Sequence, residues 1–396
     1  MNAILSPAHA ASHADARQLA INLLRRNLTP QGILAASPTR EAEARRYTRI
    51  FGRDAAICIL AMGGSGDPLL ERGAIASLDA LAAQQAGNGQ IAKYVDPEGS
   101  GADFWYVGCI DATLWWLIAV DHVRGCGLVP ADRWAAAVDK ALAWLHAQEH
   151  PHFRLLQQNE ASDWADIMPR SGFVLYTNAL WADVKQRFGL EQLAETRQHL
   201  GDLFDPFSPE LPNYPRARLM RHYARRGRSS DGLLLSFVNL STCGMEGDVF
   251  GNILAVLGGA VDESAGRRIL ETIHAAHASR PYPVRVVLRP LDKHDKLWRA
   301  YMGRHRQNLP HQYHNGGIWP FVGGFWVVAL ARLGMAELAR QELDRLISMN
   351  DDDEWRFTEW FHGQSLARGG MPGQSWNAAA LLLALDAVAG STPEAA

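Results

Sequence analysis

The sequence predicts an all-α protein built as a closed double ring of about twelve helices, an (α/α)6 toroid. Helical periodicity dominates the chain and strand signals are sparse. The helical segments come in adjacent pairs, and often one member is apolar nearly all round while the other is amphipathic. The sequence shows no repeat of about 34 residues, which makes an open solenoid less favoured. Because no Gly/Ser/Pro linker divides the chain cleanly, we expect residues 1–396 to form one domain.

The individual helices follow from their apolar spacing and end signals. Residues 13–27 carry alanine, leucine and isoleucine among charges, as an amphipathic helix does, whereas 53–63 is apolar nearly all round. The segment 67–85 begins with Asp67-Pro68, a favourable N-cap and first-turn pair. The other expected helices are 109–125, 131–147, 172–188, 189–204, 248–258, 263–277, 317–333, 335–349 and 375–389. The apolar members would form the inner ring, and loops at one end of it would shape a pocket.

Composition narrows the class of protein. Apolar residues make up 47% of the 396 and charged residues 20%, which is typical of a soluble globular protein. The net charge of −3 gives no bulk reason to expect nucleic-acid or anionic-membrane binding. No apolar run reaches the roughly eighteen residues of a membrane span. The segment Met1–Pro7 lacks the basic and apolar regions of a signal peptide, so we expect a cytoplasmic protein.

Two further features concern partners and metals. A basic cluster runs from Arg216 to Arg228, and it predicts a solvated face or, alternatively, an anionic-ligand patch or a subunit contact in a homo-oligomer. Four cysteines without a CxxC pair predict neither a disulfide framework nor a zinc site. Since no HExxH-like spacing occurs either, we expect no metal and no cofactor.

The residues that break the helical pattern fall into five loops of shared composition. These loops combine acids or amides with aromatic side chains, and they are Phe51–Asp54, Asp103–Asp111, Asn159–Arg170, Gln312–Pro320 and Glu354–Gly363, with Gln374-Ser375-Trp376 just after the last. Aromatic faces stack on pyranose C–H surfaces, while carboxylates and amides bind hydroxyls. The five loops together therefore predict a site for a neutral polyol.

Each loop also has a purely structural interpretation. Ser162 or Asp163 could cap a helix, and Arg53 with Asp54 could form a structural ion pair. Aromatic residues at helix starts usually belong to the core. His314 and His362 could be hydrogen-bonded scaffold residues.

The chain resembles the (α/α)6 glycosidases that include the amylo-α-1,6-glucosidase domain of glycogen-debranching enzymes, the alkaline/neutral invertases and the processing α-glucosidases. The most specific element of the resemblance is the run Tyr313–Pro320. The segment Asp163–Met168 resembles the family's Trp-x-Asp-x-Met, which implies that Asp166 is the general acid. The segment Glu359–Gly363 resembles Glu-x-Phe-Asp-Gly, with His362 in place of the aspartate, which implies that Glu359 is the general base.

The resemblance implies hydrolysis of an α-glucosidic bond with inversion and without a cofactor. Asp166 would protonate the glycosidic oxygen, with a pKa raised by burial beside Trp164. Glu359 would stay ionised and deprotonate a water, and the two carboxyls would stand roughly 6.5–9.5 Å apart. Asp163 is the main rival for the acid, because one residue of slip in the match exchanges them, and Asp111 is a second rival.

The remaining candidates would bind substrate. Arg53, Asp54, Asp111 and Asp163 would contact hydroxyls or support the acid, while His314, Asn315 and Gln374 would bind sugar or hold the acids. The expected aromatic contacts are Trp105, Tyr106, Trp164, Trp319, Trp360 and Trp376.

Departures from the family leave the substrate open. The chain has no room for a glucanotransferase region, and Ile167-Met168 stand where invertases have two arginines after the acid. The Pro169-Arg170 ending is closer to the processing α-glucosidase and mannosylglycerate hydrolase pattern. An α-glucosidase-like activity on an oligosaccharide or small glucoside is the first prediction, and cleavage of sucrose is the alternative. A sugar epimerase using His314 and His362, or a carbohydrate-binding protein without activity, are hypotheses from other classes.

Overall fold

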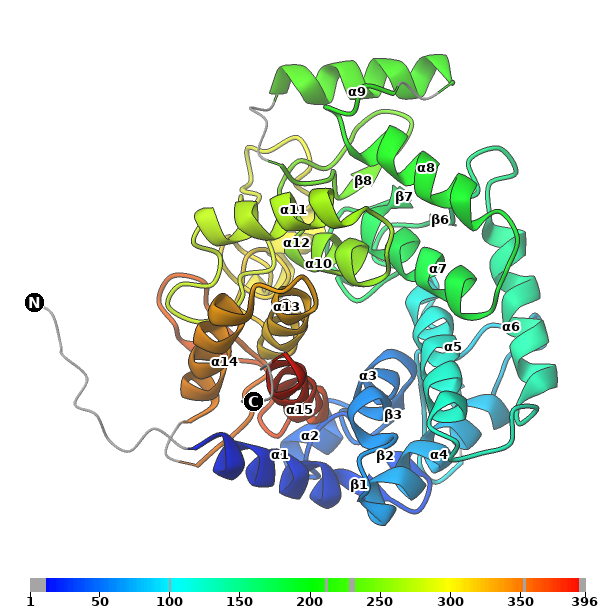
Figure 1. Ribbon diagram of the computed structural model, residues 1–396, viewed down its shortest axis with the longest axis vertical. Coiled ribbons are helices and arrows are strands. Elements are labelled where there is room, and N and C mark those ends of the chain that lie inside the picture. Colours follow the sequence, from blue (N-terminus) through cyan, green and yellow to red (C-terminus); the bar gives the residue numbers. More distant parts are fainter. Residues whose placement is uncertain (1–11, 100, 211–212, 228–231, 352–353, 392–396) are drawn as a thin grey trace, which may run out of the picture.

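Six inner helices form a closed ring in the computed structural model, which describes residues 12–99, 101–210, 213–227, 232–351 and 354–391 (Figure 1). The inner helices are α3 (Gly52–Met62), α5 (Ile110–Gly125), α7 (Leu175–Arg187), α10 (Val249–Leu257), α13 (Pro320–Arg332) and α15 (Ser375–Gly390). Each contacts the next in this order, and α15 returns to contact α3. The ring is therefore closed by the last helix packing against the first inner one.

Six outer helices surround this ring. They are α1 (His13–Asn27), α4 (Pro68–Ala83), α6 (Ala135–Gln148), α8 (Leu193–Phe204), α11 (Glu263–Ala275) and α14 (Ala336–Asn350). Five of them pack on the inner helix that precedes them in sequence, whereas α1 packs on α15. The predicted (α/α)6 toroid is confirmed, and each predicted helix is present within a few residues of its expected bounds.

Burial separates the two rings as the sequence pattern predicts. In outer helix α11, the buried residues are Gly266, Ile269, Leu270 and Ile273, which lie on one face at helical spacing. Inner helix α13 is buried along nearly its whole length, from Pro320 to Ala331. The inner helices are therefore covered on all sides, by one another and by the outer ring. No helix among the described residues is long and apolar enough to cross a membrane.

The segment 205–247, which the sequence predicts to be irregular, contains a helix. Helix α9 (Pro215–Gly227) lies outside the double ring, at the upper edge of the view in Figure 1. It carries the basic cluster up to Arg226, and Arg228 lies outside the described residues. Arg216 is exposed, as expected of a solvated face, but Arg221 is buried and donates to backbone carbonyls, including that of Pro206. Short helices α2 (Arg40–Ala44) and α12 (Ala300–Gly303) and the 3-10 turn η1 (Arg304–Arg306) were not predicted either.

Short antiparallel strands brace the loops that lead into the inner helices. One sheet joins β3 (Ile50–Phe51), β4 (Tyr94–Val95) and β5 (Ala102–Asp103), and another joins β6 (Gln157–Gln158), β7 (Gly172–Val174) and β8 (Phe237–Val238). Two hairpins pair β1 (Leu28–Thr29) with β2 (Gly32–Ile33), and β9 (Trp360–Phe361) with β10 (Arg368–Gly369). Because β3 runs directly into α3 and β7 into α7, the sheets fix the approach to these helices.

A buried ion cluster fixes the loop Asn159–Arg170 to the inner ring. The Arg170 side chain is 2% exposed, and its Nε lies 3.3 Å from Glu246 Oε1. Its Nη1 lies 3.2 Å from Asp248 Oδ2, and Asp248 is the N-cap residue of α10. One guanidinium therefore balances two carboxylates that are themselves withdrawn from water.

We predict that Arg170→Met destabilises the protein by about 3–5 kcal/mol, because it leaves two buried carboxylates without their cation. Urea unfolding followed by circular dichroism measures this change. The matched control is Arg340→Met, since the Arg340 pair with Glu337 is largely exposed, and it should cost less than about 1 kcal/mol. Equal losses from the two substitutions would contradict the prediction.

Candidate active site

The inner helices begin at one end of the ring, and their first turns meet there. Arg53 Nη2 lies 3.2 Å from Asp54 Oδ2 on α3, and Arg53 Nη1 lies 3.1 Å from Asp111 Oδ2 at the start of α5. Tyr176, in the first turn of α7, donates to the same Asp111 oxygen at 3.1 Å. The Arg53 guanidinium also lies 5.6 Å from the ring centroid of Trp376 on α15. Side chains from four inner helices thus form the floor of a site.

Glu359 lies in the loop before β9 and is 3% exposed. Its Oε1 accepts a hydrogen bond from the Tyr47 hydroxyl at 2.9 Å, and its Oε2 accepts one from the Met371 backbone N–H at 2.8 Å. Burial raises the pKa of Glu359 to about 7, although both donors oppose the rise. The charges of Asp54 and Asp166 raise the pKa of Glu359 further, so these three carboxyls act on one another.

Asp166 is the more open of the two predicted catalytic acids. Its side chain is 28% exposed, Lys93 Nζ lies 3.2 Å from its Oδ2, and His314 Nδ1 lies 3.8 Å from its Oδ1. Lys93 in turn lies 4.1 Å from the ring centroid of Trp105. The expectation that Asp166 is buried beside Trp164 is therefore wrong, since this carboxylate faces solvent and an ammonium group.

The two rivals for the acid are held inside the protein. Asp163 accepts from the Ala165 backbone N–H at 2.8 Å and from Gln158 Nε2 at 2.9 Å, so each of its oxygens has a protein donor. Burial raises the pKa of Asp163 to about 6. Asp111 has no exposed surface and bonds Arg53 and Tyr176. Of the three candidates, Asp166 has the most access to solvent.

Several predicted stacking residues are buried in an aromatic core. Trp164 packs edge-on against Phe250, His314 and Trp319, and it is 2% exposed. Trp319 is 1% exposed, stacks on His314 and donates its indole N–H to the Tyr313 carbonyl at 2.9 Å. The prediction that Trp319 offers a face to sugar is therefore wrong.

Trp376 is likewise covered on both sides. It is 4% exposed, and its ring stacks at 4.0 Å on Phe321, while the Arg53 guanidinium lies near it. The prediction of a sugar platform at Trp376 is therefore also wrong. Trp105 and Trp360 are half-buried and Tyr106 is 87% exposed, so these three rings keep accessible surface.

The predicted polar residues divide into scaffold and open candidates. Asn315 is fully buried, and its amide exchanges hydrogen bonds with the Leu291 backbone and donates to the Asn308 carbonyl. Its expected contact with sugar is wrong, because the fold uses the whole side chain. Gln374, the N-cap residue of α15, is also buried, but its amide has no hydrogen-bond partner among the described residues.

The two histidines of the epimerase alternative have different neighbours. Burial lowers the pKa of His314 to about 3, so its ring is neutral at neutral pH. His362 Nδ1 accepts the backbone N–H groups of Gln364 and Ser365, and its ring lies near His311. No described contact joins His314 to His362. Within the described chain, no group of three or more His, Cys, Asp or Glu side chains could hold a metal ion.

Sequence reasoning missed Tyr47 and Lys93, the direct partners of the two candidate catalytic acids. Tyr47 lies shortly before α3, outside the five aromatic loops, and Lys93 is the single basic residue in the Gly-rich segment 87–103. The available signal was that this segment is polar and lies between two predicted helices. The roles of both residues depend on contacts between segments far apart in the sequence.

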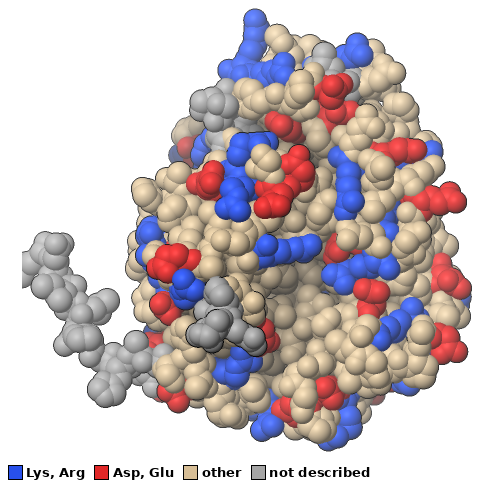
Figure 2. Space-filling model, in the orientation of Figure 1, with Lys and Arg blue, Asp and Glu red and all other residues tan. Residues whose placement is uncertain are grey.

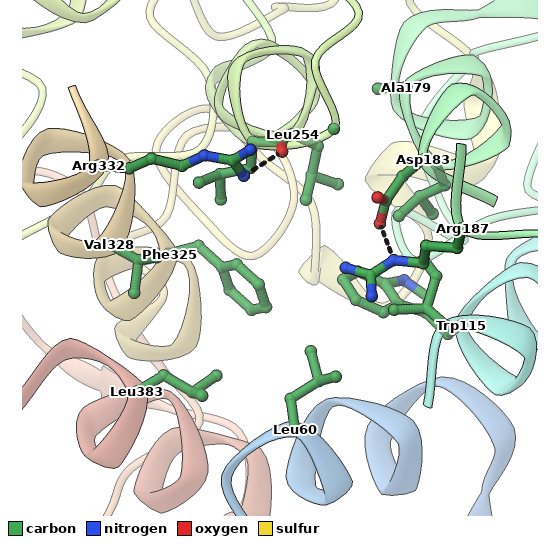
Figure 3. Close-up of a pocket in the computed structure, with 14 residues that line it drawn as sticks. Leu60, Trp115, Ala179, Asp183, Arg187, Leu254, Phe325, Val328, Arg332 and Leu383 are labelled. Carbon is green, nitrogen blue, oxygen red and sulfur yellow. Dashed lines mark hydrogen bonds and ion pairs between the residues drawn. The ribbon is translucent and has the colours of Figure 1, made fainter. Parts of the chain in front are cut away.

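A separate cavity of about 210 Å³ lies at the opposite end of the inner ring (Figure 3). Leu60, Phe325 and Leu383 line it, and the Asp183–Arg187 ion pair and Arg332 lie at its edge. The space-filling view shows the ring hollowed near its centre on the face toward the viewer (Figure 2). Because neither Asp166 nor Glu359 lines this cavity, it is not the candidate active site.

Comparisons with known proteins agree with this architecture. Residues 229–389 match the family model described as alkaline and neutral invertase, a match that includes Glu359 and excludes Asp166. Solved structures that cover nearly the whole chain include a wild-type glycosidase, at 16% identity and a TM-score of 0.61 over 96% of this chain and 97% of that one. The GH63 mannosylglycerate hydrolase from Thermus thermophilus, in complex with glucose, is 12% identical with a TM-score of 0.63, over 93% of this chain and 99% of that one.

The chain has the fold of the six-hairpin glycosidases. The resemblance expected from the sequence is thereby confirmed at the level of fold and partial family match. Among curated relatives, alkaline/neutral invertase C, mitochondrial, of Arabidopsis thaliana is 28% identical over 103 residues, which is 26% of this chain and 15% of that protein. Neutral/alkaline invertase 1, mitochondrial, of Oryza sativa subsp. japonica is 24% identical over 135 residues, 33% of this chain and 21% of that protein. The matches thus cover only a small part of the relatives' length.

We predict that Glu359→Gln changes the free energy of unfolding, relative to wild type, more favourably at pH 8 than at pH 5. The pKa of Glu359 is about 7 in the folded protein, above the ordinary glutamate value of 4.5, so the folded state holds the proton more tightly. Stability from this group is complete below about pH 4.5, falls as pH rises to about 7, and stays low above that. Glutamine cannot ionise and avoids this loss, which amounts to at most about 3 kcal/mol.

Urea unfolding of both proteins at the two pH values measures this difference. The control is Glu337→Gln, because donors from Gln341 and Arg340 lower the pKa of that exposed carboxyl, so it is ionised at both pH values and its substitution effect should be the same at pH 5 and pH 8. A substitution effect at Glu359 that is equal at pH 5 and pH 8 would refute the buried-carboxyl interpretation.

Proposed function

We propose that this protein is an inverting glycoside hydrolase that cleaves an α-glucosidic bond, with Asp166 as general acid and Glu359 as general base. One observation carries the proposal. An open carboxylate, Asp166, and a buried one, Glu359, come from distant loops to the same end of the ring, where the charge of one changes the pKa of the other. Such a pair in unlike environments is what acid–base hydrolysis of a glycoside needs. We further propose that the ring forms a single catalytic domain.

The surroundings of Glu359 suit a base that works near neutral pH. A general base is most effective when its pKa lies close to the operating pH, and burial brings the pKa of Glu359 to about 7. The hydrogen bonds from Tyr47 and Met371 hold its two oxygens in a fixed orientation. The expectation of a permanently ionised Glu359 therefore needs correction, because a substantial fraction is protonated at pH 7.

The surroundings of Asp166 add a requirement to the mechanism. A general acid must reach the glycosidic oxygen, and the Lys93 ammonium occupies the position beside Asp166 Oδ2, at 3.2 Å. The proposal therefore requires Lys93 Nζ to leave the carboxylate when the glycosidic oxygen arrives. Trp105, which already lies beneath Lys93, would then offer part of its face to the sugar.

The candidate substrates within this class are ranked from the composition of the loops and from the comparisons. An oligosaccharide or small glucoside is the first candidate, because the site joins neutral amides, carboxyls and the accessible rings of Trp105, Tyr106 and Trp360. Sucrose is the second candidate, since residues 229–389 match the invertase model. A glycosyl conjugate of glycerate is the third, on the likeness to a mannosylglycerate hydrolase. A cytoplasmic location and a homo-oligomeric state remain predictions from the sequence.

We predict different losses for the two carboxyls on two kinds of substrate. Asp166→Asn should lower kcat for an unactivated glucoside by about 100- to 10,000-fold, because the leaving group is no longer protonated. It should largely retain activity on α-glucosyl fluoride, since fluoride leaves with little protonation. Glu359→Gln should lose activity on both substrates, because each reaction needs an activated water.

Asp163→Asn is the matched comparison on the same loop. If Asp163→Asn, and not Asp166→Asn, keeps activity on the fluoride alone, the acid is Asp163. If Glu359→Gln shows that pattern, the two roles are exchanged. NMR of the first-formed sugar should show the β anomer, and the α anomer would rule out inversion.

We predict that the acidic limb of the kcat/KM profile has an apparent pKa near 7, because Glu359 must lose its proton to act as base. Tyr47→Phe should move this limb to higher pH by about one unit, because the Tyr47 hydroxyl lowers the pKa of Glu359. Initial rates from pH 5 to 9 measure both effects. If Tyr47→Phe leaves the acidic limb unchanged, the limb does not report the ionisation of Glu359.

A further inference from the structure

A second cavity, here named the amide cavity, lies beside the loop Asn159–Arg170. Its volume is about 470 Å³, within the roughly 300–1,000 Å³ of small-molecule sites. It is bounded by the start of α5, the last turns of α6 and strand β6. Its polar side chains are Gln90, Trp144, Gln148, Gln157, Gln158, Asn159 and Ser162. Neither Asp166 nor Glu359 lines it.

The lining of the amide cavity is uncharged. No Asp, Glu, Lys, Arg or His is among the twelve residues that form it, although charged residues are a fifth of the chain. A carboxamide offers both donors and an acceptor, which matches hydroxyl groups that also do both. Anions, cations and metals would need charges that the cavity does not supply. The lining therefore selects neutral ligands rich in hydroxyl groups.

Several of these polar groups are unused by the fold. The described residues give no hydrogen bond to the amides of Gln148 and Gln157 or to the indole N–H of Trp144. Gln90 donates only to Cys109 Sγ, at 3.8 Å, within the described chain. By contrast, Gln158 donates to Asp163 and accepts from Thr177, so it forms part of the wall. These groups come from three separate segments and line one space, where Gln90, Trp144 and Gln148 are half-buried and Gln157 is exposed.

Trp144 adds the apolar component that a sugar ring needs. It is half-buried, packs against the hydrophobic core on one side and lines the amide cavity on the other. Indole faces stack on pyranose C–H surfaces while the indole N–H bonds a hydroxyl. An unused indole beside unused amides is the composition of a saccharide site.

We propose that the amide cavity is a second saccharide-binding site, which holds a neutral sugar unit through Trp144, Gln148 and Gln157. This site does not depend on the proposed hydrolysis, because its residues are distinct from the acid pair. It adjoins the candidate active site through the Gln158–Asp163 hydrogen bond at 2.9 Å. A sugar bound there would lie against the loop that carries Asp166, because Asn159 and Ser162 of that loop line the cavity.

The indole N–H resonance of Trp144 in a ¹⁵N spectrum tests this proposal. Loss of one signal in Trp144→Phe identifies the resonance, and Glu359→Gln protein prevents any consumption of ligand. Sucrose, maltotriose and glucose 6-phosphate are added separately, up to about 100 mM, to reach weak millimolar binding. We expect a saturable shift with the neutral sugars and a weaker response to the phosphate.

Gln148→Ala should weaken the binding seen at Trp144 by about five-fold, as for loss of a hydrogen bond or two to a neutral ligand. Gln341→Ala, on the exposed face of outer helix α14, is the matched control and should leave it unchanged. No shift of Trp144 with either neutral sugar, or a shift that Gln148→Ala leaves intact, would overturn the proposal. Wild-type protein that hydrolyses nothing but shows the shift would refute the proposed activity and keep this site.

Discussion

The closure of the ring between α15 and α3 is the constraint on which the candidate active site depends. Asn27 on α1 donates to Ser375 Oγ at 2.8 Å and to the Gly373 carbonyl at 2.9 Å, and these hydrogen bonds are buried. The Ser375 hydroxyl donates in turn to the Leu34 carbonyl. Each of these buried hydrogen bonds stabilises the junction by about 0.5–1.5 kcal/mol. Tyr47 and Glu359, which belong to the two sides of this junction, meet only because it is closed.

The second constraint acts on the other carboxyl. Loop Asn159–Arg170 contains a buried acid and an accessible acid within a few residues. The Arg170 ion cluster fixes the end of this loop. With Arg170 fixed to the start of α10, Asp163 turns inward onto Gln158 and Ala165, and Asp166 stays at the surface of the site. The ion cluster thus anchors the end of a loop in which Asp163 is buried and Asp166 is accessible.

The helices could be predicted from the sequence because each one depends on local information. Asp67 caps α4 through its own side chain, with Pro68 following, and the four buried positions of α11 repeat at helical spacing. Helix α9 was missed because its many arginines hide the short apolar stripe of Ala217, Met220 and Ala224. Arg221 is held by backbone carbonyls of a preceding turn.

The site could be predicted only in part, because its parts depend on distant contacts. Its acids belong to short segments with a family resemblance, but the environment of each acid comes from elsewhere. Lys93 reaches Asp166 across 73 residues, and Tyr47 reaches Glu359 across 312. The sequence shows that Trp319 and Trp376 stand at helix starts, but their burial depends on His314 and Phe321, which pack over them in three dimensions.

The partnership of α1 with α15 also has a consequence for how the toroid is made. Ser375 follows Asn27 by 348 residues, so the face of α1 that packs on α15 has no inner helix to cover until that whole stretch has been synthesised. At about 5–20 residues per second, the interval lasts on the order of half a minute. During it, the ring is open, and the edge that α15 will cover is formed by α1 and α3. A chaperone that binds apolar surface would therefore find this face of α1 uncovered throughout synthesis of the stretch.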